Sequence, residues 1–379
     1  MEPVAIVGWA MSDQASHVVS SRDEMIFDCV KEALDTTGLT RDDIATVITN
    51  SNDFYDGHTI SQVYTIDAEG AYAKDETKVE QEGLHAMYYG FMRLLAGHHN
   101  TAMIVAYSRA SDMQPHAALA AQLDPTYERQ FNFLNDTAIA ALQARAYMEK
   151  HGAREGDLAR VALKNLLNGS RNKKVKARGA VSSVDEVKAS PMAFSPLREL
   201  MVYPETDGIC VLLMATEKRA KSITKKPVWV KGFGMSQELY YAGERDLTRI
   251  KSAQDAAKMA YKMAGIKASD IDVAEVCELF AHQELMLTEA LGFAKPGQGA
   301  KLLKSRATEV GGKIPVNPSG GALAACALNA VSLVRVVECA KQLLGEADNQ
   351  VKGAKTALAH GQCGPAAQNN IVTILSKTK

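Results

Sequence analysis

Two kinds of apolar pattern alternate along the first part of the chain. Short β-branched runs predict buried strands, and longer runs with apolar residues at helical spacing predict amphipathic helices. The strands are expected at Val4–Gly8, Ile44–Thr49 and Thr101–Tyr107, and the helices at Arg22–Thr37 and Val79–Gly97. Gly38 ends the first helix, and the polar stretch 50–75 is expected to be a loop. Strands that alternate with helices indicate crossover connections and mostly parallel sheets.

The second half of the chain repeats this order. Pro3–Gly8 (PVAIVG) resembles Pro227–Gly232 (PVWVKG), and Lys31–Leu39 (KEALDTTGL) resembles Lys258–Ile266 (KMAYKMAGI). Two copies of a β-α-β-α-β unit predict a pseudo-twofold architecture. We expect the repeated apolar helix of each half to pack between the sheets, and the functional site to lie where the halves meet.

An inserted segment interrupts the first half. Residues 108–203 are rich in Gln, Asn, Lys and Arg, and they show helical patterns at Asn135–His151 and Glu155–Asn168. We therefore predict three units. Residues 1–107 plus 204–220 form the N-terminal half, residues 108–203 form a helical loop domain, and residues 225–379 form the C-terminal half.

Composition narrows the class of protein. The 379 residues are 46% hydrophobic, which indicates a globular core, and the formal net charge of −1 does not favour a nucleic-acid partner. The six cysteines form no C-x-x-C pair, so neither a disulfide framework nor a metal site is expected in this chain. No apolar run approaches the roughly 20 residues that span a membrane, and the N-terminus lacks a basic signal-peptide region. A cytoplasmic protein is expected.

The most distinctive stretch is Gly311–Gly321 (GGKIPVNPSGG), followed by the apolar helical run Ala322–Val337. Glycine pairs around a Pro-Val-Asn-Pro core predict a rigid, irregular loop. A loop that leads into a helix presents free N–H groups at the positive end of the helix dipole. Gly320 and Gly321 are therefore candidates for holding an anionic part of a cofactor. A close-packed buried helix with a glycine entry explains the same residues without a ligand.

A basic stretch in the insert, residues 171–178 (RNKKVKAR), is a second candidate binding region. Lys173, Lys174 and Arg178 are expected to contact the phosphates of a ligand if the stretch is functional. The alternative is a solvated loop.

Together these features resemble the thiolase superfamily over the whole chain. The doubled halves, the inserted loop domain, the NPSGG loop and the final strand-turn-strand occur in the family's order. Asp348–Gly353 (DNQVKG) looks most like the subset of thiolases that works with a separate small zinc-ribbon/OB-fold protein. The resemblance implies an α/β thiolase fold in five α/β/α/β/α layers, a homodimer core, an acyl-CoA substrate and coenzyme A as co-substrate.

The family's catalytic pattern is incomplete in this chain. In thiolases the acylated cysteine opens the buried helix of the first half, in a pattern like V-x-C-x-S-G-L-x-A. Val79–Ala86 (VEQEGLHA) fits that register and places Glu80 at the cysteine position. Ala324–Asn329 (AACALN) stands where the family has Gly-His-Pro, so the loop histidine is missing too. The usual acyl-enzyme route does not carry over.

Other residues remain as candidates for catalysis. His360 and Cys363 stand three apart in the motif HGQCG and could form a His–thiol pair. Glu80 could act as a general base, or it could simply cap the helix. Glu278 and His282 stand four apart, so one helical face could carry both, although a structural core histidine also explains His282.

Three functions fit these residues. The first, which we take as the prediction, is thiolase-type acyl transfer: cleavage of a C–C bond beside a CoA thioester by one subunit of a hetero-oligomer, in lipid or aromatic acid metabolism. The second is a retro-aldolase on a β-hydroxyacyl-CoA, which needs a base and enolate donors but no nucleophile. The family's retro-aldolases use tyrosines near the last motifs, and none occurs between Gly311 and Lys379. The third is a catalytically silent subunit. The absence of a concave pocket would favour this alternative.

Overall fold

A computed structural model describes residues 2–379 except 113–122, 132–134 and 180. Nine strands form one mixed sheet in the order β3-β2-β4-β7-β1-β8-β11-β10-β9. They are β1 Val4–Met11, β2 Thr46–Asn50, β3 Asp75–Val79, β4 Thr101–Arg109, β7 Asp207–Thr216, β8 Val228–Gln237, β9 Val273–Glu275, β10 Thr356–Cys363 and β11 Asn369–Ser376. In the insert, β5 (Met192–Phe194) and β6 (Leu197–Arg198) form a separate pair.

The two halves of the sheet meet at β1 and β8. These strands pair antiparallel with Ala5 opposite Trp229, so the pseudo-twofold halves share one continuous sheet. Parallel pairing in the described sheet is limited to β2 with β3, β2 with β4, and β9 with β10. The prediction of mostly parallel sheets is therefore wrong. One reason is the short turn 364–368 between β10 and β11, since a connection of this length joins only antiparallel strands.

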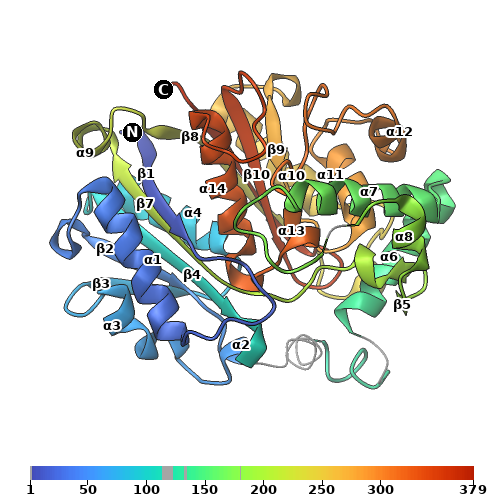
Figure 1. The fold of residues 1–379 in the computed structure, drawn as a ribbon, viewed down its shortest axis with the longest axis horizontal. Coiled ribbons are helices and arrows are strands. Elements are labelled where there is room, and N and C mark those ends of the chain that lie inside the picture. Colours follow the sequence, from blue (N-terminus) through green and yellow to red (C-terminus); the bar gives the residue numbers. More distant parts are fainter. Residues whose placement is uncertain (1, 113–122, 132–134, 180) are drawn as a thin grey trace.

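Five layers follow from where the helices lie (Figure 1). The helices are α1 Arg22–Thr37, α2 Asp53–Asp56, α3 Ile66–Glu69, α4 Gly83–Leu95, α6 Asp136–His151, α7 Glu155–Gly169, α8 Val184–Ala189, α9 Glu217–Ile223, α10 Lys251–Ala264, α11 Ala281–Ala290, α12 Gly299–Lys304, α13 Gly321–Ala324 and α14 Val331–Leu344. Helices α1 and α9 cover the outer face of the first half-sheet, and α10 covers that of the second. Helices α4 and α14 lie between the halves and share one core with strands of both. The predicted α/β/α/β/α arrangement is confirmed.

The described residues of the inserted segment share their core with the second half of the chain. Tyr147 of α6 and Leu158 of α7 belong to the same hydrophobic cluster as Leu285 of α11 and Val316. The predicted domain boundaries stay a prediction, but the insert packs directly on the second half and brings its residues to the junction between the halves. Among the described helices, none is long and apolar enough to cross a lipid bilayer.

The start of the first buried helix differs from the prediction. Residues 75–79 form the edge strand β3, which pairs parallel with β2, and α4 begins only at Gly83. This shifts the helix N-terminus by several residues, and it changes which side chain stands there.

The apolar run after the NPSGG loop is also not one helix, as the sequence predicted. Helix α13 ends at Ala324, Ala325 is extended, and α14 begins at Val331. The Thr206 N–H donates a hydrogen bond to the carbonyl of Cys326. Pairing with a distant segment thus overrides the local helical pattern, and it turns the residues after Cys326 toward the junction of the halves.

Candidate active site

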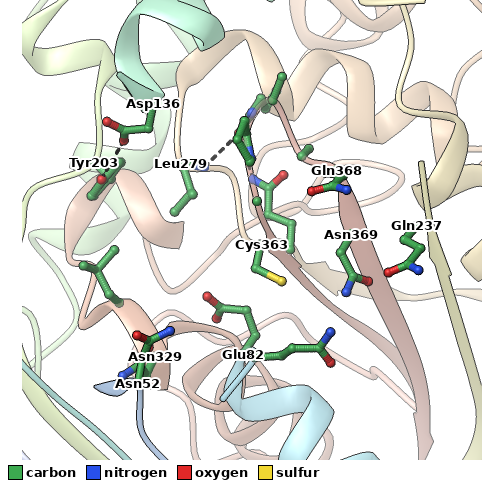
Figure 2. A pocket seen from close by; sticks show the side chains of 18 of the residues that line it. Asn52, Glu82, Asp136, Tyr203, Gln237, Leu279, Asn329, Cys363, Gln368 and Asn369 are labelled. Carbon is green, nitrogen blue, oxygen red and sulfur yellow. Dashed lines mark hydrogen bonds between the residues drawn. The ribbon is translucent and has the colours of Figure 1, made fainter. Parts of the chain in front are cut away.

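A pocket of about 350 Å³ opens where the two halves and the insert meet. The N-terminus of α4 and the end of β10 form one side of it (Figure 2). Its polar side chains are mostly amides and acids. The amides are Asn52, Gln81, Gln237, Gln283, Asn329, Gln362, Gln368 and Asn369, and the acids are Glu80, Glu82 and Asp136. The pocket lies at the place where the internal repeat predicted a site.

Glu82 occupies the N-terminus of α4. It is the residue before the first helical turn, so its carboxyl group stands at the positive end of the helix dipole. Ser332 of α14 hydrogen-bonds one side of this carboxyl group, while Oε2 has no partner among the described residues. Burial raises the pKa of Glu82 well above its usual value, and the bonds from Ser332 offset only part of that shift. A carboxyl group with a raised pKa and an unpaired oxygen is suited to accept and return a proton.

Cys363 is the thiol of the pocket. It ends β10 and is partly exposed, and its sulfur lies beside the Glu82 carboxyl group (Figure 2). Burial raises the pKa of Cys363 to about 12, and the neighbouring Glu82 carboxylate raises it further than the Glu82 main-chain N–H lowers it. Cys363 is therefore a neutral thiol at physiological pH.

His360 does not pair with Cys363, contrary to the prediction. Both lie within strand β10, where residues three apart face opposite sides. His360 Nδ1 accepts a hydrogen bond from the Cys277 N–H (3.3 Å), which leaves Nε2–H to donate to Asn370 Oδ1 (2.8 Å). Burial lowers the pKa of His360 to about 4. This imidazole is a neutral structural group with both nitrogens occupied.

Glu80 lies at the rim of the pocket and not at the helix N-terminus, where the family register predicted a carboxylate. Its side chain is 51% exposed and pairs with Lys78 Nζ at 2.8 Å, and Lys78 also pairs with Asp53. Glu80 therefore does not cap α4, and its carboxylate is half exposed in a surface ion pair. Glu82, two residues later, is the residue that precedes the first turn of α4, and it is partly buried.

Glu278 and His282 do not share a helical face. Glu278 precedes α11 and points away from the pocket, where it accepts hydrogen bonds from Asn165 (2.8 Å) and Asn317 (2.5 Å). Burial and the neighbouring Glu284 raise the pKa of Glu278. His282 is fully buried in α11 and contacts Gln143 Oε1 through Nε2 (3.0 Å). The two residues act in separate buried networks.

The NPSGG loop binds an acidic side chain of the protein itself. The Glu278 carboxylate accepts a hydrogen bond from the Leu323 N–H (3.2 Å) at the start of α13, the position predicted for a cofactor anion. Gly320 and Gly321 are buried with positive φ, and a Cβ on Gly320 would lie 2.5 Å from the Gly169 main chain. The loop therefore fills its own anion position and leaves no space there for a ligand.

Replacement of Gly321 by alanine tests this packing. A Cβ there would lie 2.1 Å from Glu278 Oε1, and φ of +65° is unfavourable for alanine, so we expect Gly321→Ala to cost roughly 2–4 kcal/mol of stability. Gly345→Ala is the control, since φ is +82° with nothing within 4 Å, and about 1 kcal/mol is expected. Urea unfolding of both variants checks the difference. Equal losses would show that the contact with Glu278 is not tight.

The basic residues predicted to hold phosphates lie outside the pocket lining. The Lys173 side chain is exposed and pairs with Asp348 (3.4 Å), and Lys174 Nζ lies 3.8 Å from Asp13. Arg178 donates to the carbonyl groups at residues 199 and 202, and burial lowers its pKa to about 10. Lys173 is exposed at the surface in its pair with Asp348, whereas Arg178 holds the main chain of the insert.

The sequence prediction missed Tyr203, which the insert brings to the pocket. Its hydroxyl donates to Asp136 Oδ2 at 2.8 Å, and its ring packs edge-on against Phe280 at 5.7 Å. Burial and Asp136 raise the pKa of Tyr203 well above its usual value, so the phenol stays protonated. The search for tyrosines after Gly311 could not find this residue, because the fold and not the sequence order brings it close.

Asn329 was also missed as a functional residue. It lies in the stretch AACALN and is 3% exposed, and its Nδ2 has no partner among the described residues. An unpaired amide donor in a buried pocket wall is costly unless a ligand oxygen satisfies it. The position of this stretch after the NPSGG loop was the signal that pointed to it.

Comparison with known proteins identifies the family. A family model described as Thiolase C-terminal domain-like matches residues 234–377. The acetyl-CoA acetyltransferase of Methanothermobacter thermautotrophicus is 32% identical over 289 residues, which cover 74% of this chain and 75% of that protein. The chain belongs to the thiolase family.

Two further comparisons extend this result. The 17-hydroxy-3-oxo-4-pregnene-20-carboxyl-CoA lyase of Mycobacterium tuberculosis is 25% identical over 249 residues, 64% of each chain. The solved structure named Ltp2-ChsH2(DUF35) aldolase has a TM-score of 0.86 at 20% identity and covers 100% of this chain and 99% of its own. The predicted family and fold are confirmed, and a role in acyl-CoA chemistry follows from the family. The type of reaction has to be inferred from the residues of the pocket.

Proposed function

We propose that this chain catalyses an aldol-type reaction on an acyl-CoA, with Glu82 as the group that moves the proton. In the cleavage direction, ionised Glu82 removes the proton of a β-hydroxyl, and the oxygen forms the C=O bond of a released aldehyde or ketone. The Cα–Cβ bond breaks, and its electron pair enters the enolate of the thioester. Protonated Glu82 then returns the proton to Cα, which completes a shortened acyl-CoA.

The observation that carries this proposal is the carboxyl group of Glu82 at the N-terminus of α4. Its pKa is raised and one oxygen lacks a partner, so it is suited to accept and return a proton. Asn329 Nδ2, unpaired in the same pocket, is the candidate donor to the enolate oxygen. The Tyr203 hydroxyl, whose proton goes to Asp136, lies on another wall and presents an acceptor oxygen to the pocket. The names of the lyase and aldolase relatives agree with this chemistry.

Acyl transfer remains the second candidate because Cys363 lies in the pocket. In that reaction Glu82 would take the thiol proton, and the sulfur would attack a β-keto group, with the Cα–Cβ electrons leaving as the thioester enolate. Coenzyme A would then release the acyl group from the sulfur. The name of the acetyltransferase relative favours this reaction, whereas a thiol pKa of about 12 opposes it.

Cys363→Ala separates the two reactions. We expect the variant to keep cleavage of β-hydroxyacyl-CoAs within a few-fold, because the aldol route needs no nucleophile. The measurement is product formation from matched β-hydroxyacyl- and β-ketoacyl-CoAs, with and without free coenzyme A. Coenzyme-A-dependent cleavage of the keto substrate that disappears in Cys363→Ala would instead establish acyl transfer.

The assembly belongs to the same proposal. A homodimer core and a small zinc-ribbon/OB-fold partner are supported by the family and by the name of the DUF35-partnered aldolase. Coenzyme A would be bound as part of the substrate, with its phosphates at the surface near Lys173 and Lys174. The assay is therefore run on the chain alone and with such a partner protein. If neither preparation turns over any substrate, the chain is a silent subunit.

A further inference from the structure

We propose, building on the aldol-type function above, that the pocket selects a neutral acyl group bearing a hydroxyl, and that Gln362 Oε1 accepts the hydrogen bond of this hydroxyl. Gln362 lies between His360 and Cys363 in the HGQCG motif. It lines the pocket and is 1% exposed.

The orientation of the Gln362 amide follows from its partners. Nε2 donates to the carbonyl of Cys277 (2.7 Å) and to Gln283 Oε1 (2.7 Å). A main-chain carbonyl can only accept, so the NH₂ group must face Cys277. The acceptor Oε1 is therefore on the other side, where no described residue donates to it.

The neighbouring amides do not allow the opposite orientation. Gln283 Oε1 also accepts from the Leu279 N–H (3.2 Å), which only donates. Gln283 Nε2 donates to Gln143 Oε1 (3.2 Å), and Gln143 Nε2 donates to the Ala366 carbonyl (3.1 Å). Hydrogen bonds with main-chain groups thus fix the orientation of the three amides of Gln143, Gln283 and Gln362. Gln362 Oε1 is the acceptor that stays unpaired.

An unpaired acceptor and an unpaired donor define the ligand chemistry. Gln362 Oε1 needs an O–H or N–H donor, whereas Asn329 Nδ2 needs an oxygen acceptor. A thioester with a hydroxyl on its acyl chain supplies both, while a keto group supplies no donor. When Glu82 is protonated, the hydroxyl hydrogen points to Gln362, and ionised Glu82 withdraws it in the reaction.

The charges of the pocket exclude an acidic acyl group. Glu80, Glu82 and Asp136 line it, and no lysine or arginine of the described residues does. Arg245 reaches the lining only to donate to the carbonyl of Pro365 (2.6 Å) and at longer range to that of Ala366. The residues outside the described part of the chain include no lysine or arginine. A second carboxylate on the ligand would therefore find no counter-charge.

Binding to the Glu82→Gln variant tests the proposal without turnover, because glutamine imitates protonated Glu82. Calorimetry compares 3-hydroxyhexanoyl-CoA, hexanoyl-CoA and adipoyl-CoA. We expect the hydroxy ligand to bind about 10-fold to 100-fold more tightly than hexanoyl-CoA, and adipoyl-CoA to bind more weakly than either. Adding Gln362→Leu should abolish the hydroxyl preference. Adding Gln368→Leu, the control at a pocket amide that donates to the Glu238 carbonyl, should keep it.

Equal affinity for the hydroxy and deoxy ligands would overturn the proposal, and so would tight binding of adipoyl-CoA. This comparison decides even if Gln362→Leu fails to fold, since it uses no substitution at residue 362. A hydroxyl preference without turnover of any hydroxyacyl-CoA by the wild type would refute the aldol function and keep the selectivity. Turnover of a hydroxyacyl-CoA without a binding preference for the hydroxyl would keep the aldol function and refute the selectivity.

Discussion

Glu82→Gln is expected to lower kcat for cleavage of a β-hydroxyacyl-CoA by about 10²- to 10⁴-fold, with little change in KM. Glutamine keeps the size of the side chain and the contacts with Ser332, but it cannot take the proton of the hydroxyl. Loss confined to kcat marks a group that acts in the transition state. Steady-state kinetics with the best substrate of the panel measures both constants.

Glu80→Gln is the matched control, since it makes the same change two residues away. Glu80 is half exposed and paired with Lys78, so its loss removes one weak surface ion pair. We expect less than about a fivefold effect on kcat. If Glu80→Gln were the more damaging substitution, the register of the family motif would identify the acid–base residue better than the burial of Glu82 does.

The pH dependence of kcat/KM in the wild type should also reflect the ionisation of Glu82. Glu82 must be ionised to accept the proton, so kcat/KM falls as pH drops below its pKa. Because burial raises that pKa, the acid limb should lie well above the value of about 4.3 of an ordinary glutamate. The residual activity of Glu82→Gln should lack this limb. An acid limb that stays near the ordinary glutamate value would contradict the assignment.

The difference between Glu80 and Glu82 shows what a sequence pattern can predict about a site. The motif register found the correct segment, because the glycine and apolar residues of α4 repeat the family spacing. It pointed to Glu80 and not to the proposed Glu82, since it placed the helix start at residue 79, where the chain forms β3, an edge strand without any strong local signal. Exposure and pKa are properties of the packed chain.

The HGQCG motif gives a second example. Its place before the last turn predicted chemistry at His360 and Cys363, and the fold does put Cys363 in the pocket. Strand geometry then directs His360 into a structural network. Gln362 lies between them in the sequence. Its NH₂ group donates to Cys277 and Gln283, so its unpaired oxygen is on the opposite side of the amide. Only the partners of an amide reveal whether it is satisfied.

The overall architecture was more predictable, because it depends on repeated apolar spacing and not on single residues. The internal repeat correctly predicted two helices packed between two halves. The sense of strand pairing was not predictable from alternation alone, since β7 and β11 return antiparallel beside parallel strands. These return strands bring distant segments, such as the end of the insert with Tyr203, to the junction where the pocket lies.

Arg335→Leu is expected to cause the largest loss of stability, roughly 3–5 kcal/mol. Arg335 of α14 is 1% exposed, and its guanidinium bonds Glu275 of β9 (3.0 Å) and Ser319 of the NPSGG loop (2.6 Å). Leucine would remove the buried counter-charge of Glu275 and leave only Ser319 to hydrogen-bond that carboxyl, whose pKa burial already raises. The midpoint of urea unfolding at fixed protein concentration measures the loss.

Two further variants show whether the loss comes from the unpaired charge. The double variant Glu275→Gln with Arg335→Leu removes the charge and should recover part of the stability, because a neutral amide can still bond Ser319. Arg306→Leu breaks an exposed pair with Glu309 of similar length (2.8 Å) and should cost less than about 1 kcal/mol. If Arg335→Leu cost no more than Arg306→Leu, the buried pair would not be what fastens the NPSGG loop between β9 and α14. The pocket wall at Asn329, which continues from that loop, would then owe its position to apolar packing and to hydrogen bonds such as that from the Thr206 N–H to the Cys326 carbonyl.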